Sequence, residues 1–155
     1  MEVNAREIMT SPVICAEPEA TLADVVKLMA ESNISGVPIV DCDRKPIGMI
    51  SETDIVNYAG QNQAIKLVGS SGWMSPYTQV TSNVLYGKGY EMLSKTLVKN
   101  IMAKNVVKVK ENTSALEIAR LMNRKNINRV PVVDSDGKLT GIITRANIVK
   151  FLAES

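Results

Sequence analysis

The chain has 155 residues, 45% of them hydrophobic, and a formal net charge of +2 at pH 7. This length suits one compact domain or two half-domains that share a core. Because the charge is small and the basic residues are scattered, neither a nucleic acid nor an anionic membrane is an expected partner. The absence of histidine excludes Ser/His/Asp triads, Cys/His dyads and histidine-based metal sites.

Signals for targeting and for disulfides are also sparse. No apolar run of about 18 residues and no charged-then-apolar leader occurs, so we expect neither a transmembrane helix nor a signal peptide. We therefore expect a cytoplasmic protein. Cys15 and Cys42 are isolated in the sequence, and we expect two reduced thiols rather than a disulfide.

A repeated segment organises the chain. Residues 34–41, Ile-Ser-Gly-Val-Pro-Ile-Val-Asp, are matched without a gap by residues 127–134, Ile-Asn-Arg-Val-Pro-Val-Val-Asp, at a spacing of 93 (131 − 38 = 93). Residues 47–54 are matched by residues 140–147 at the same spacing. The sequence therefore predicts two copies of one unit, each too small to fold alone.

In chain order, each repeat begins with a short amphipathic lead-in, at residues 3–9 and again at 96–102. Short strands are predicted next, at residues 12–15 and 106–109, where β-branched residues dominate. The two repeats thus predict the same order of elements from their first residues onward.

Capping signals predict the first helix of each repeat. Thr21 and Asp24 have the spacing of a capping box, and Ser114 and Glu117 repeat it. The apolar residues that follow recur at i, i+3, i+4 and i+7, as on one face of an amphipathic helix. They are Leu22, Val25, Val26 and Met29 in the first repeat and Ala115, Ile118, Ala119 and Met122 in the second.

Two strands joined by a polar turn follow the helix in each repeat. They are predicted at residues 37–41 and 47–51, and again at 130–134 and 139–144. The turn of the second repeat contains Asp136-Gly137, which is the stronger hairpin signal. A second helix is predicted directly after each pair of strands, so each repeat has the order strand, helix, strand, strand, helix.

A central segment has no counterpart in the repeat. We predict a first unit at residues 1–57, an insert rich in glycine, serine and aromatic residues at 58–95, and a second unit at 96–155. A connection of this length is usually functional, partly helical or disordered. For Trp73 and Tyr77 two interpretations stay open, namely packing beneath a long loop or a lid over a binding site.

Outside the insert, the doubled pattern Ile-x-x-Val-Pro-Ile/Val-Val-Asp, a polar turn and Gly-x-Ile-Ser/Thr-x-x-Asp/Asn resembles a tandem pair of CBS domains, often called a Bateman module. The resemblance implies an α+β fold in which two pseudosymmetric β-α-β-β-α units pack sheet to sheet about a pseudo-twofold axis. It also implies two clefts that commonly hold adenosine derivatives such as AMP, ADP, ATP or S-adenosylmethionine.

Ser51 and Asp54 suggest a chemical role that does not depend on the resemblance. A hydroxyl group where a strand meets a helix, beside free amides and the positive end of the helix dipole, suits a phosphate. A carboxylate one turn further on can accept both hydroxyls of a ribose. The same two residues also have the spacing of an ordinary capping box, so a purely structural role stays open.

By motif position, the resemblance assigns residues to two clefts. The first cleft would use Asp54 for ribose and Ser51 for phosphate, with an adenine pocket of Met102, Val107, Ile127 and Asn128. The second cleft would use Asn147 and Thr144, with an adenine pocket of Met9, Ile14, Ile34, Ser35 and Gly36.

Two arginines of the second repeat add positive charge near its predicted site. Arg129 matches a position that holds a phosphate-binding arginine in AMP-activated kinase regulatory subunits, and Arg145 follows Thr144 directly. A guanidinium group binds phosphate bidentately, although a solvated surface role stays open for both residues. Asn147 lacks the charge and paired acceptors of Asp54. We therefore expect unequal sites, with the better ribose anchor in the first and the better phosphate grip in the second.

Taken together, the sequence predicts a non-catalytic regulatory module that reports energy or metabolite status to a partner protein. No general base, activated nucleophile or metal cluster is recognisable, so we expect no enzyme activity, metal or required cofactor. The resemblance implies a homodimer, with the helices at 53–59 and 145–152 or the aromatic insert as candidate interfaces, and regulation of an effector protein in trans. A nucleic-acid-binding module and a ligand-free structural interaction protein stay open as alternatives.

Overall fold

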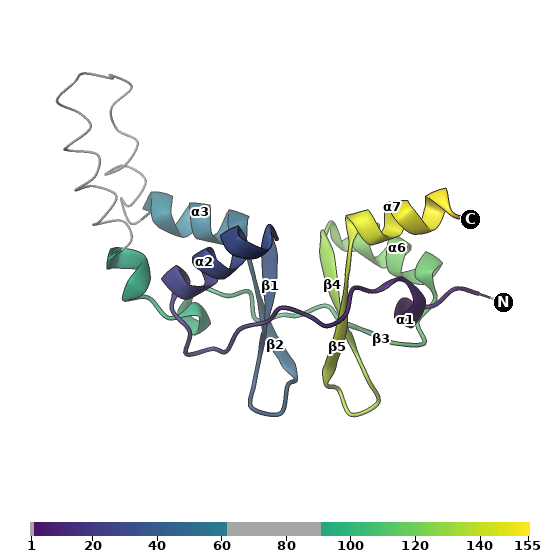
Figure 1. The fold of residues 1–155 in the computed structure, drawn as a ribbon, viewed down its shortest axis with the longest axis horizontal. Helices are drawn as coiled ribbons and strands as arrows, with labels where there is room; N and C mark the ends of the chain where they lie inside the picture. The colour runs from purple at the N-terminus through teal and green to yellow at the C-terminus, as the bar shows by residue number, and fades with distance from the viewer. Residues whose placement is uncertain (1, 62–90) are drawn as a thin grey trace, which may run out of the picture. The chain divides into compact units, whose positions relative to one another are not determined.

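The computed structural model describes residues 2–61 and 91–155 and combines helices with strands, which confirms the predicted α+β class (Figure 1). The elements in chain order are α1 (Ala5–Ile8), α2 (Leu22–Ser32), β1 (Gly36–Val40), β2 (Pro46–Ser51), α3 (Glu52–Gln61), the 3₁₀ helix η1 (Val98–Asn100), β3 (Val109–Lys110), α6 (Ala115–Lys125), β4 (Arg129–Val133), β5 (Leu139–Thr144) and α7 (Arg145–Ala153). Trp73 and Tyr77 of the predicted insert lie outside the described residues.

The chain forms two compact units, and each unit combines residues from both repeats. Unit 1 consists of Met1–Cys15, Pro38–Gly48 and Lys104–Ser155, and unit 2 consists of Ala16–Val37 and Met49–Ala103. The boundaries at 1–57, 58–95 and 96–155 describe the repeat in the sequence and stay a prediction.

Unit 1 contains a three-stranded sheet with the order β3-β4-β5. β3 is parallel to β4, with Val109 opposite Val132, and β4 is antiparallel to β5, with Arg129 opposite Thr144. Side chains along β5 alternate between buried and half-buried, whereas β4 is buried continuously from Val130 onward. A strand without this alternation has both of its faces covered.

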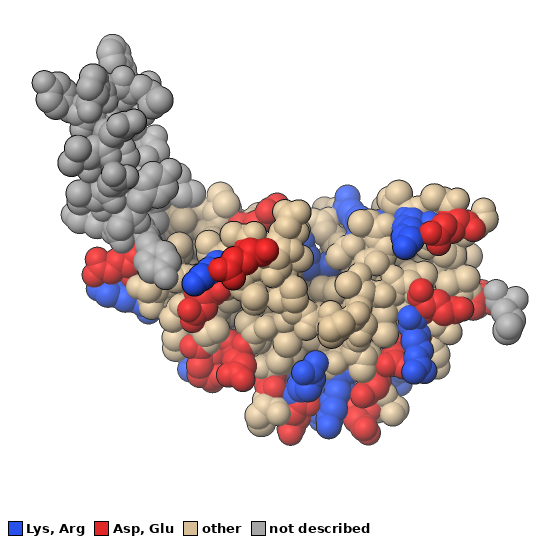
Figure 2. Space-filling model, viewed as in Figure 1, with Lys and Arg blue, Asp and Glu red and all other residues tan. Residues whose placement is uncertain are grey.

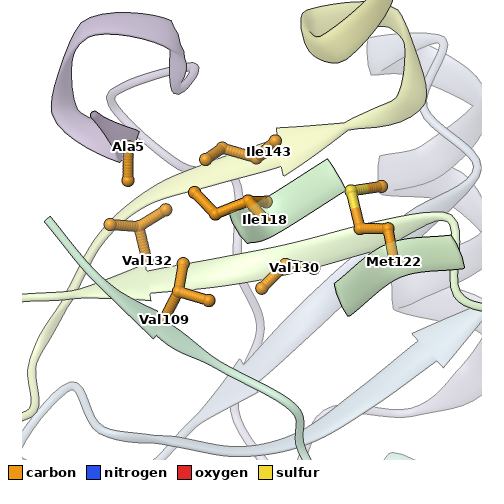
Figure 3. Close-up of a cluster of buried hydrophobic side chains, with 7 residues drawn as sticks. All are labelled: Ala5, Val109, Ile118, Met122, Val130, Val132 and Ile143. Atoms are coloured by element: carbon orange, nitrogen blue, oxygen red, sulfur yellow. The ribbon is translucent and has the colours of Figure 1, made fainter. Parts of the chain in front are cut away.

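The hydrophobic core of unit 1 joins this sheet to α1 and α6 (Figure 3). It is formed by Ala5, Val109, Ile118, Met122, Val130, Val132 and Ile143. Met9 and Ile127 are partly buried and pack against it. Since Ala5 and Met9 come from the first repeat, the lead-in of the first repeat is part of the core built by the second.

The two lead-ins make equivalent backbone pairs in different units. In unit 1, the Thr10 N–H donates to the Ile142 carbonyl at 2.8 Å, and the Ile142 N–H donates to the Thr10 carbonyl at 3.0 Å. In unit 2, Ala103 and Met49 form the same antiparallel pair at 2.9 and 3.0 Å. Thr10 and Ala103, like Met49 and Ile142, are separated by the repeat spacing, so the two repeats exchange their lead-ins.

The predicted helix starts are confirmed. Thr21 Oγ1 accepts a hydrogen bond from the Asp24 N–H at 3.1 Å, and Asp24 Oδ2 accepts one from the Thr21 N–H at 3.2 Å. Ser114 caps α6 through one half of the predicted box, since its hydroxyl oxygen accepts from the Glu117 N–H at 3.2 Å. Both helices also end alike, at Asn33 and Asn126 with φ of 52° and 53°. Asparagine tolerates this left-handed conformation and so ends a helix at low cost.

One aspartate holds the hairpin turn of each repeat. Asp41 Oδ1 accepts from the N–H groups two and four residues further on, both at 2.9 Å. Asp134 Oδ1 makes the same two bonds at 2.9 and 3.0 Å. The turn position with positive φ is Arg44 (61°) in the first repeat and Gly137 (82°) in the second. Glycine adopts this conformation with no Cβ penalty, which explains why Asp-Gly is the stronger turn signal.

The strand predicted at residues 12–15 is wrong. These residues are irregular in the structure, and an isolated bridge occurs only at Ala16. The strand predicted at 106–109 forms later than expected, because β3 begins at Val109. β-Branched composition therefore indicated which segment of the second repeat forms a strand. It did not indicate the residue at which that strand begins.

A proline explains the difference between the repeats at this strand. In unit 1 the ladder continues past β3, since the Glu111 N–H donates to the Val133 carbonyl at 3.2 Å. The position equivalent to Glu111 is Pro18, which has no N–H group and cannot donate a ladder hydrogen bond. The first repeat therefore lacks the backbone hydrogen bond that continues the ladder past β3 in the second repeat.

Gly141 of β5 allows the lead-in to approach the sheet closely. A Cβ atom on Gly141 would lie 2.6 Å from Cγ and 2.9 Å from Cβ of Met9. Because Met9 immediately precedes the Thr10 and Ile142 backbone pair, any added atom at Gly141 must displace the segment that makes this pair.

We expect Gly141→Ala to lower the free energy of unfolding by about 1–3 kcal/mol, since the overpacked lead-in must shift. Urea denaturation measures this change. Gly60→Ala in α3 is the matched control, because a Cβ there meets nothing within 4 Å. That substitution should raise stability by about 0.5–1 kcal/mol. Equal stabilities for the two variants would contradict the proposed close approach.

Candidate functional site

The first predicted site begins where β2 meets α3. Asp54 Oδ2 accepts a hydrogen bond from the Ser51 N–H at 2.9 Å and another from the Ser51 hydroxyl at 3.0 Å. Ser51 Oγ in turn accepts from the Asp54 N–H at 3.3 Å. Both side chains are half-buried. The two residues therefore cap α3, as the structural interpretation of their spacing predicts.

Capping leaves part of the Asp54 carboxylate available. Its second oxygen, Oδ1, has no hydrogen-bond partner within the described ranges 2–61 and 91–155. An ionised carboxylate has about four lone-pair sites on its two oxygens, so the capping bonds do not exhaust it. A half-buried acceptor thus remains at the N-terminal end of α3, where a hydroxyl donor of a ligand can bind.

The equivalent junction in the second repeat carries an amide. Asn147 Oδ1 accepts from the Thr144 N–H at 2.8 Å and from the Thr144 hydroxyl at 2.9 Å. Asn147 Nδ2 donates to the Ile8 carbonyl at 2.9 Å and to Thr10 Oγ1 at 3.2 Å. The side chain therefore caps α7 and also binds the lead-in of the first repeat.

The two arginines of the second repeat lie in different places within unit 1. Arg129 is half-buried and directly opposite Thr144 in the β4–β5 pair, so both side chains project from the same face of the sheet. Arg145 lines a groove of about 250 Å³ between α6 and α7. The other lining residues are Ala119, Met122, Asn123, Ile127, Ile148 and Val149. Arg129 is thus the arginine placed on the sheet face of Thr144.

The residues predicted for the adenine pockets are divided between the two units. Unit 1 contains Met9, Ile14, Val107, Ile127 and Asn128, and unit 2 contains Ile34, Ser35, Gly36 and Met102. Met9 and Ile127 pack against the core of unit 1, whereas Ile14 is 40% exposed. The carbonyl groups of Ser35 and Asn128 accept hydrogen bonds from the first N–H groups of α3 and α7, respectively. These assignments stay predictions.

A cavity of about 470 Å³ also lies in unit 1, beside α1 and α7. Its lining residues are Val3, Glu7, Ile8, Met9, Thr10, Asn147, Lys150, Phe151, Glu154 and Ser155. Only Met9 and Asn147 were among the predicted site residues. The motif did not point to Thr10, a direct partner of Asn147. A signal was nevertheless present in the sequence, because Thr10 aligns with Ala103 where Asn147 aligns with Asp54.

Within residues 2–61 and 91–155, no group of three or more cysteine, aspartate or glutamate side chains is placed to hold a metal ion. None of the helices described is both long enough and apolar enough to span a bilayer.

The structure is a tandem α+β repeat. Each strand-to-helix junction carries one hydroxyl side chain and one carboxylate or amide side chain. The sequence matches the CBS domain family over residues 5–60 and 98–154. The chain belongs to this family, with one CBS domain in each repeat.

Known relatives agree with this assignment. Protein MJ1426 of Methanocaldococcus jannaschii is 32% identical over 151 residues, which are 95% of this chain and 89% of the relative. The CBS domain pair of protein MJ0100, solved in complex with 5′-methylthioadenosine and S-adenosyl-L-methionine, is 25% identical with a TM-score of 0.72, covering 97% of this chain and 99% of that one.

A plant protein shares the same fold. The structure of CBSX2 in complex with AMP has a TM-score of 0.72 at 24% identity and covers 98% of this chain and 97% of that one. The chain spans 56% of the full length of CBSX2 from Arabidopsis thaliana and the same share of its relative CBSX1.

We expect Ser51→Ala to lower the free energy of unfolding by about 1 kcal/mol in the absence of any nucleotide, because α3 loses its capping hydroxyl. Chemical denaturation of nucleotide-free protein measures this. Ser155→Ala is the control, since that hydroxyl donates to the Phe151 carbonyl at an exposed position, and its effect should stay within about 0.5 kcal/mol. A Ser51→Ala variant as stable as the wild type would argue against the capping role.

Proposed function

We propose that this chain is a non-catalytic regulatory module that binds an adenosine-containing ligand, namely AMP, ADP, ATP or S-adenosylmethionine. The observation that carries the proposal is Oδ1 of Asp54, which lies beside the Ser51 hydroxyl and has no hydrogen-bond partner among the described residues. The family supports it, because related CBS domain pairs have been solved with 5′-methylthioadenosine, S-adenosyl-L-methionine and AMP. No resident cofactor is part of the proposal.

In unit 2, each part of such a ligand has a chemically suited partner. Asp54 accepts hydrogen bonds from the ribose hydroxyls through Oδ1, which has no partner among the described residues. The Ser51 hydroxyl and the N-terminal end of α3 suit a phosphate through the helix dipole, although the Glu52 N–H already donates to the Ser35 carbonyl and the Asp54 N–H to Ser51 Oγ. Met102 is half-buried in the same unit and offers apolar, polarisable surface to an adenine ring.

In unit 1, the equivalent groups favour phosphate over ribose. Thr144 and Arg129 face the same side of the β4–β5 pair, and a guanidinium group can hold a phosphate through two hydrogen bonds. Asn147 offers ribose no carboxylate. A phosphate role for Arg145 stays a prediction, since its side chain lines the groove between α6 and α7.

The proposed output is a change in how the module binds an effector protein in trans. A ligand can shift a conformational equilibrium only by as much as it prefers one state over the other, so the output requires a ligand contact that differs between states. A cytoplasmic location also stays a prediction, and the Arabidopsis relatives CBSX1 and CBSX2 are chloroplastic.

Two alternative functions make different chemical demands. Nucleic-acid binding requires a continuous basic surface. On the face shown in Figure 2, the described lysine and arginine side chains are interspersed with aspartate and glutamate. A ligand-free interaction protein requires no ligand-dependent stability, whereas a ligand that prefers the native state must raise the melting temperature.

We expect Asp54→Ala to weaken binding of both AMP and S-adenosylmethionine by about tenfold to a hundredfold, because each ligand loses a charge-assisted hydrogen bond to its ribose. Titration calorimetry measures the affinities. Arg129→Ala tests the phosphate role of unit 1, because only AMP carries a phosphate: AMP binding that falls while S-adenosylmethionine binding is unchanged would support that role.

The matched control for this titration is Asp43→Ala, which removes an exposed carboxylate from the β1–β2 turn. It should bind both ligands as the wild type does. Unchanged binding in both Asp54→Ala and Arg129→Ala would overturn the assignment of these residues. Mass spectrometry of any nucleotide that copurifies with the wild-type chain identifies the ligand directly.

We further propose that the module forms a homodimer through the exposed apolar faces of α3 and α7. Val56 and Val149 are 56% and 65% exposed and occupy equivalent positions of the two repeats. Leu152 on α7 is also exposed, and the groove between α6 and α7 adjoins Val149. Apolar side chains exposed at the same position twice fit a second copy of the chain better than solvent.

We expect Val56→Glu and Val149→Glu each to shift the protein from dimer to monomer, because a buried unpaired carboxylate opposes association. Sedimentation velocity measures the change. Leu116→Glu places the same charge at an exposed apolar position on α6 and should leave the dimer intact. A monomeric wild type, or dimeric Glu variants at both valines, would contradict this interface.

A further inference from the structure

The Asn147 side chain is fully occupied by the protein itself. An amide oxygen can accept two hydrogen bonds and an amide nitrogen can donate two. Oδ1 accepts from two groups of Thr144, and Nδ2 donates to Ile8 and Thr10. The orientation of the amide is fixed by chemistry, because the Thr144 N–H can only donate and the Ile8 carbonyl can only accept.

The equivalent contacts cannot form in unit 2. Asp54 aligns with Asn147 but has no N–H to donate to the carbonyl of Ile101, which aligns with Ile8. Ala103 aligns with Thr10 but has no hydroxyl group. The backbone pair between Met49 and Ala103 nevertheless brings the second lead-in to the same place on its hairpin. Two differences between the repeats, Asp54 in place of Asn147 and Ala103 in place of Thr10, thus leave unit 2 without the side-chain link. One oxygen of the Asp54 carboxylate then has no partner among the described residues.

Unit 2 holds its lead-in by a side chain at a different position. The Tyr58 hydroxyl lies 2.6 Å from Thr96 Oγ1, near the C-terminal end of α3 and at the start of the lead-in. Ala103 lies at the other end of that lead-in. It is bridged to Met49, a residue of β2 shortly before α3 begins. The end of the lead-in that carries Met102 is therefore held to its hairpin by backbone bonds without the amide link found in unit 1.

We propose that Asn147 and Thr10 form a built-in tie that takes the place of ligand hydroxyls in unit 1, so that the chain binds one adenosine ligand, through Asp54 in unit 2. The inference rests on the function proposed above. In unit 2 a ligand held by Asp54 and Met102 links α3 to the lead-in, as Asn147 does in unit 1. Ligand binding therefore stabilises the segment that ends at Ala103 and leaves the segment that ends at Thr10 unchanged.

Two backbone amides report on this difference. The N–H groups of Thr10 and Ala103 occupy equivalent positions and donate to equivalent carbonyls, at 2.8 and 2.9 Å. In hydrogen exchange followed by NMR on the full chain, the Ala103 amide should exchange about tenfold faster than the Thr10 amide without ligand, because two side-chain hydrogen bonds are missing. Saturating AMP should slow exchange at Ala103 only, and calorimetry should give one AMP per chain.

Exchanging the residues between the repeats tests the cause. Asn147→Asp with Thr10→Ala keeps an acid cap on α7 of the kind seen at Asp54 and removes the tie, so the amide at position 10 should exchange faster and a second AMP should bind. Asp54→Asn with Ala103→Thr should install the tie, slowing exchange at position 103 without ligand and abolishing AMP binding.

The outcomes separate this inference from the proposed function. If the wild type binds neither AMP nor S-adenosylmethionine, the proposed function fails, while the exchange rates of the ligand-free variants still decide whether the tie exists. Two AMP molecules bound per wild-type chain with equal affinity would overturn the inference. Unchanged exchange at position 10 in the Asn147→Asp, Thr10→Ala variant would overturn it as well.

Discussion

The fold depends on an antiparallel backbone pair between a lead-in and a hairpin strand of the other repeat. Thr10 makes this pair with Ile142, and Ala103 makes it with Met49. The pair places Ala5 and Met9 against the core of unit 1, where their apolar burial adds to the two backbone hydrogen bonds. Because each compact unit is completed by residues of the other repeat, neither CBS domain contains its own complete core.

Positions that agree between the repeats and positions that differ have different physical roles. Asn33 and Asn126 end helices with the same left-handed backbone, and Asp41 and Asp134 hold identical turns. Backbone geometry imposes these residues, so both repeats need them. Two of the positions that differ carry predicted site residues: Asp54 in the first turn of α3 aligns with Asn147 in that of α7, and Gly36 at the start of β1 aligns with Arg129 at the start of β4. Capping does not require these differences, since Asp54 and Asn147 both cap their helices.

The sequence predicted those features whose cause lies within a few residues. Helix caps such as Thr21 with Asp24 and the hairpin at Gly137 follow from local hydrogen bonding and local backbone geometry, and the structure confirms them. The strand expected at residues 12–15 does not form, and the equivalent residues 105–108 of the second repeat are irregular as well, since pairing there begins only at Val109. Local composition alone does not reveal how far a strand can extend.

Sequence patterns do not predict which residues far apart in the chain contact one another. The exchange of lead-ins leaves no local signature, because both repeats carry the same amphipathic pattern and would pack equally well in either order. The spacing of Ser51 and Asp54 predicted a capped helix and a possible ribose acceptor. It did not predict which carboxylate oxygen stays free, or that Asn147 binds a carbonyl 139 residues away.

The two strand-to-helix junctions differ, so the two CBS domains are not equivalent toward a ligand. A site whose polar groups are already satisfied gains little from a ligand, because each new hydrogen bond must replace an existing one. Asn147 is in this condition, whereas Asp54 Oδ1 has no protein partner among the described residues and can accept a hydrogen bond from a ligand without replacing one within the protein. Under the proposed function, a ligand therefore changes the free energy of unit 2 more than that of unit 1.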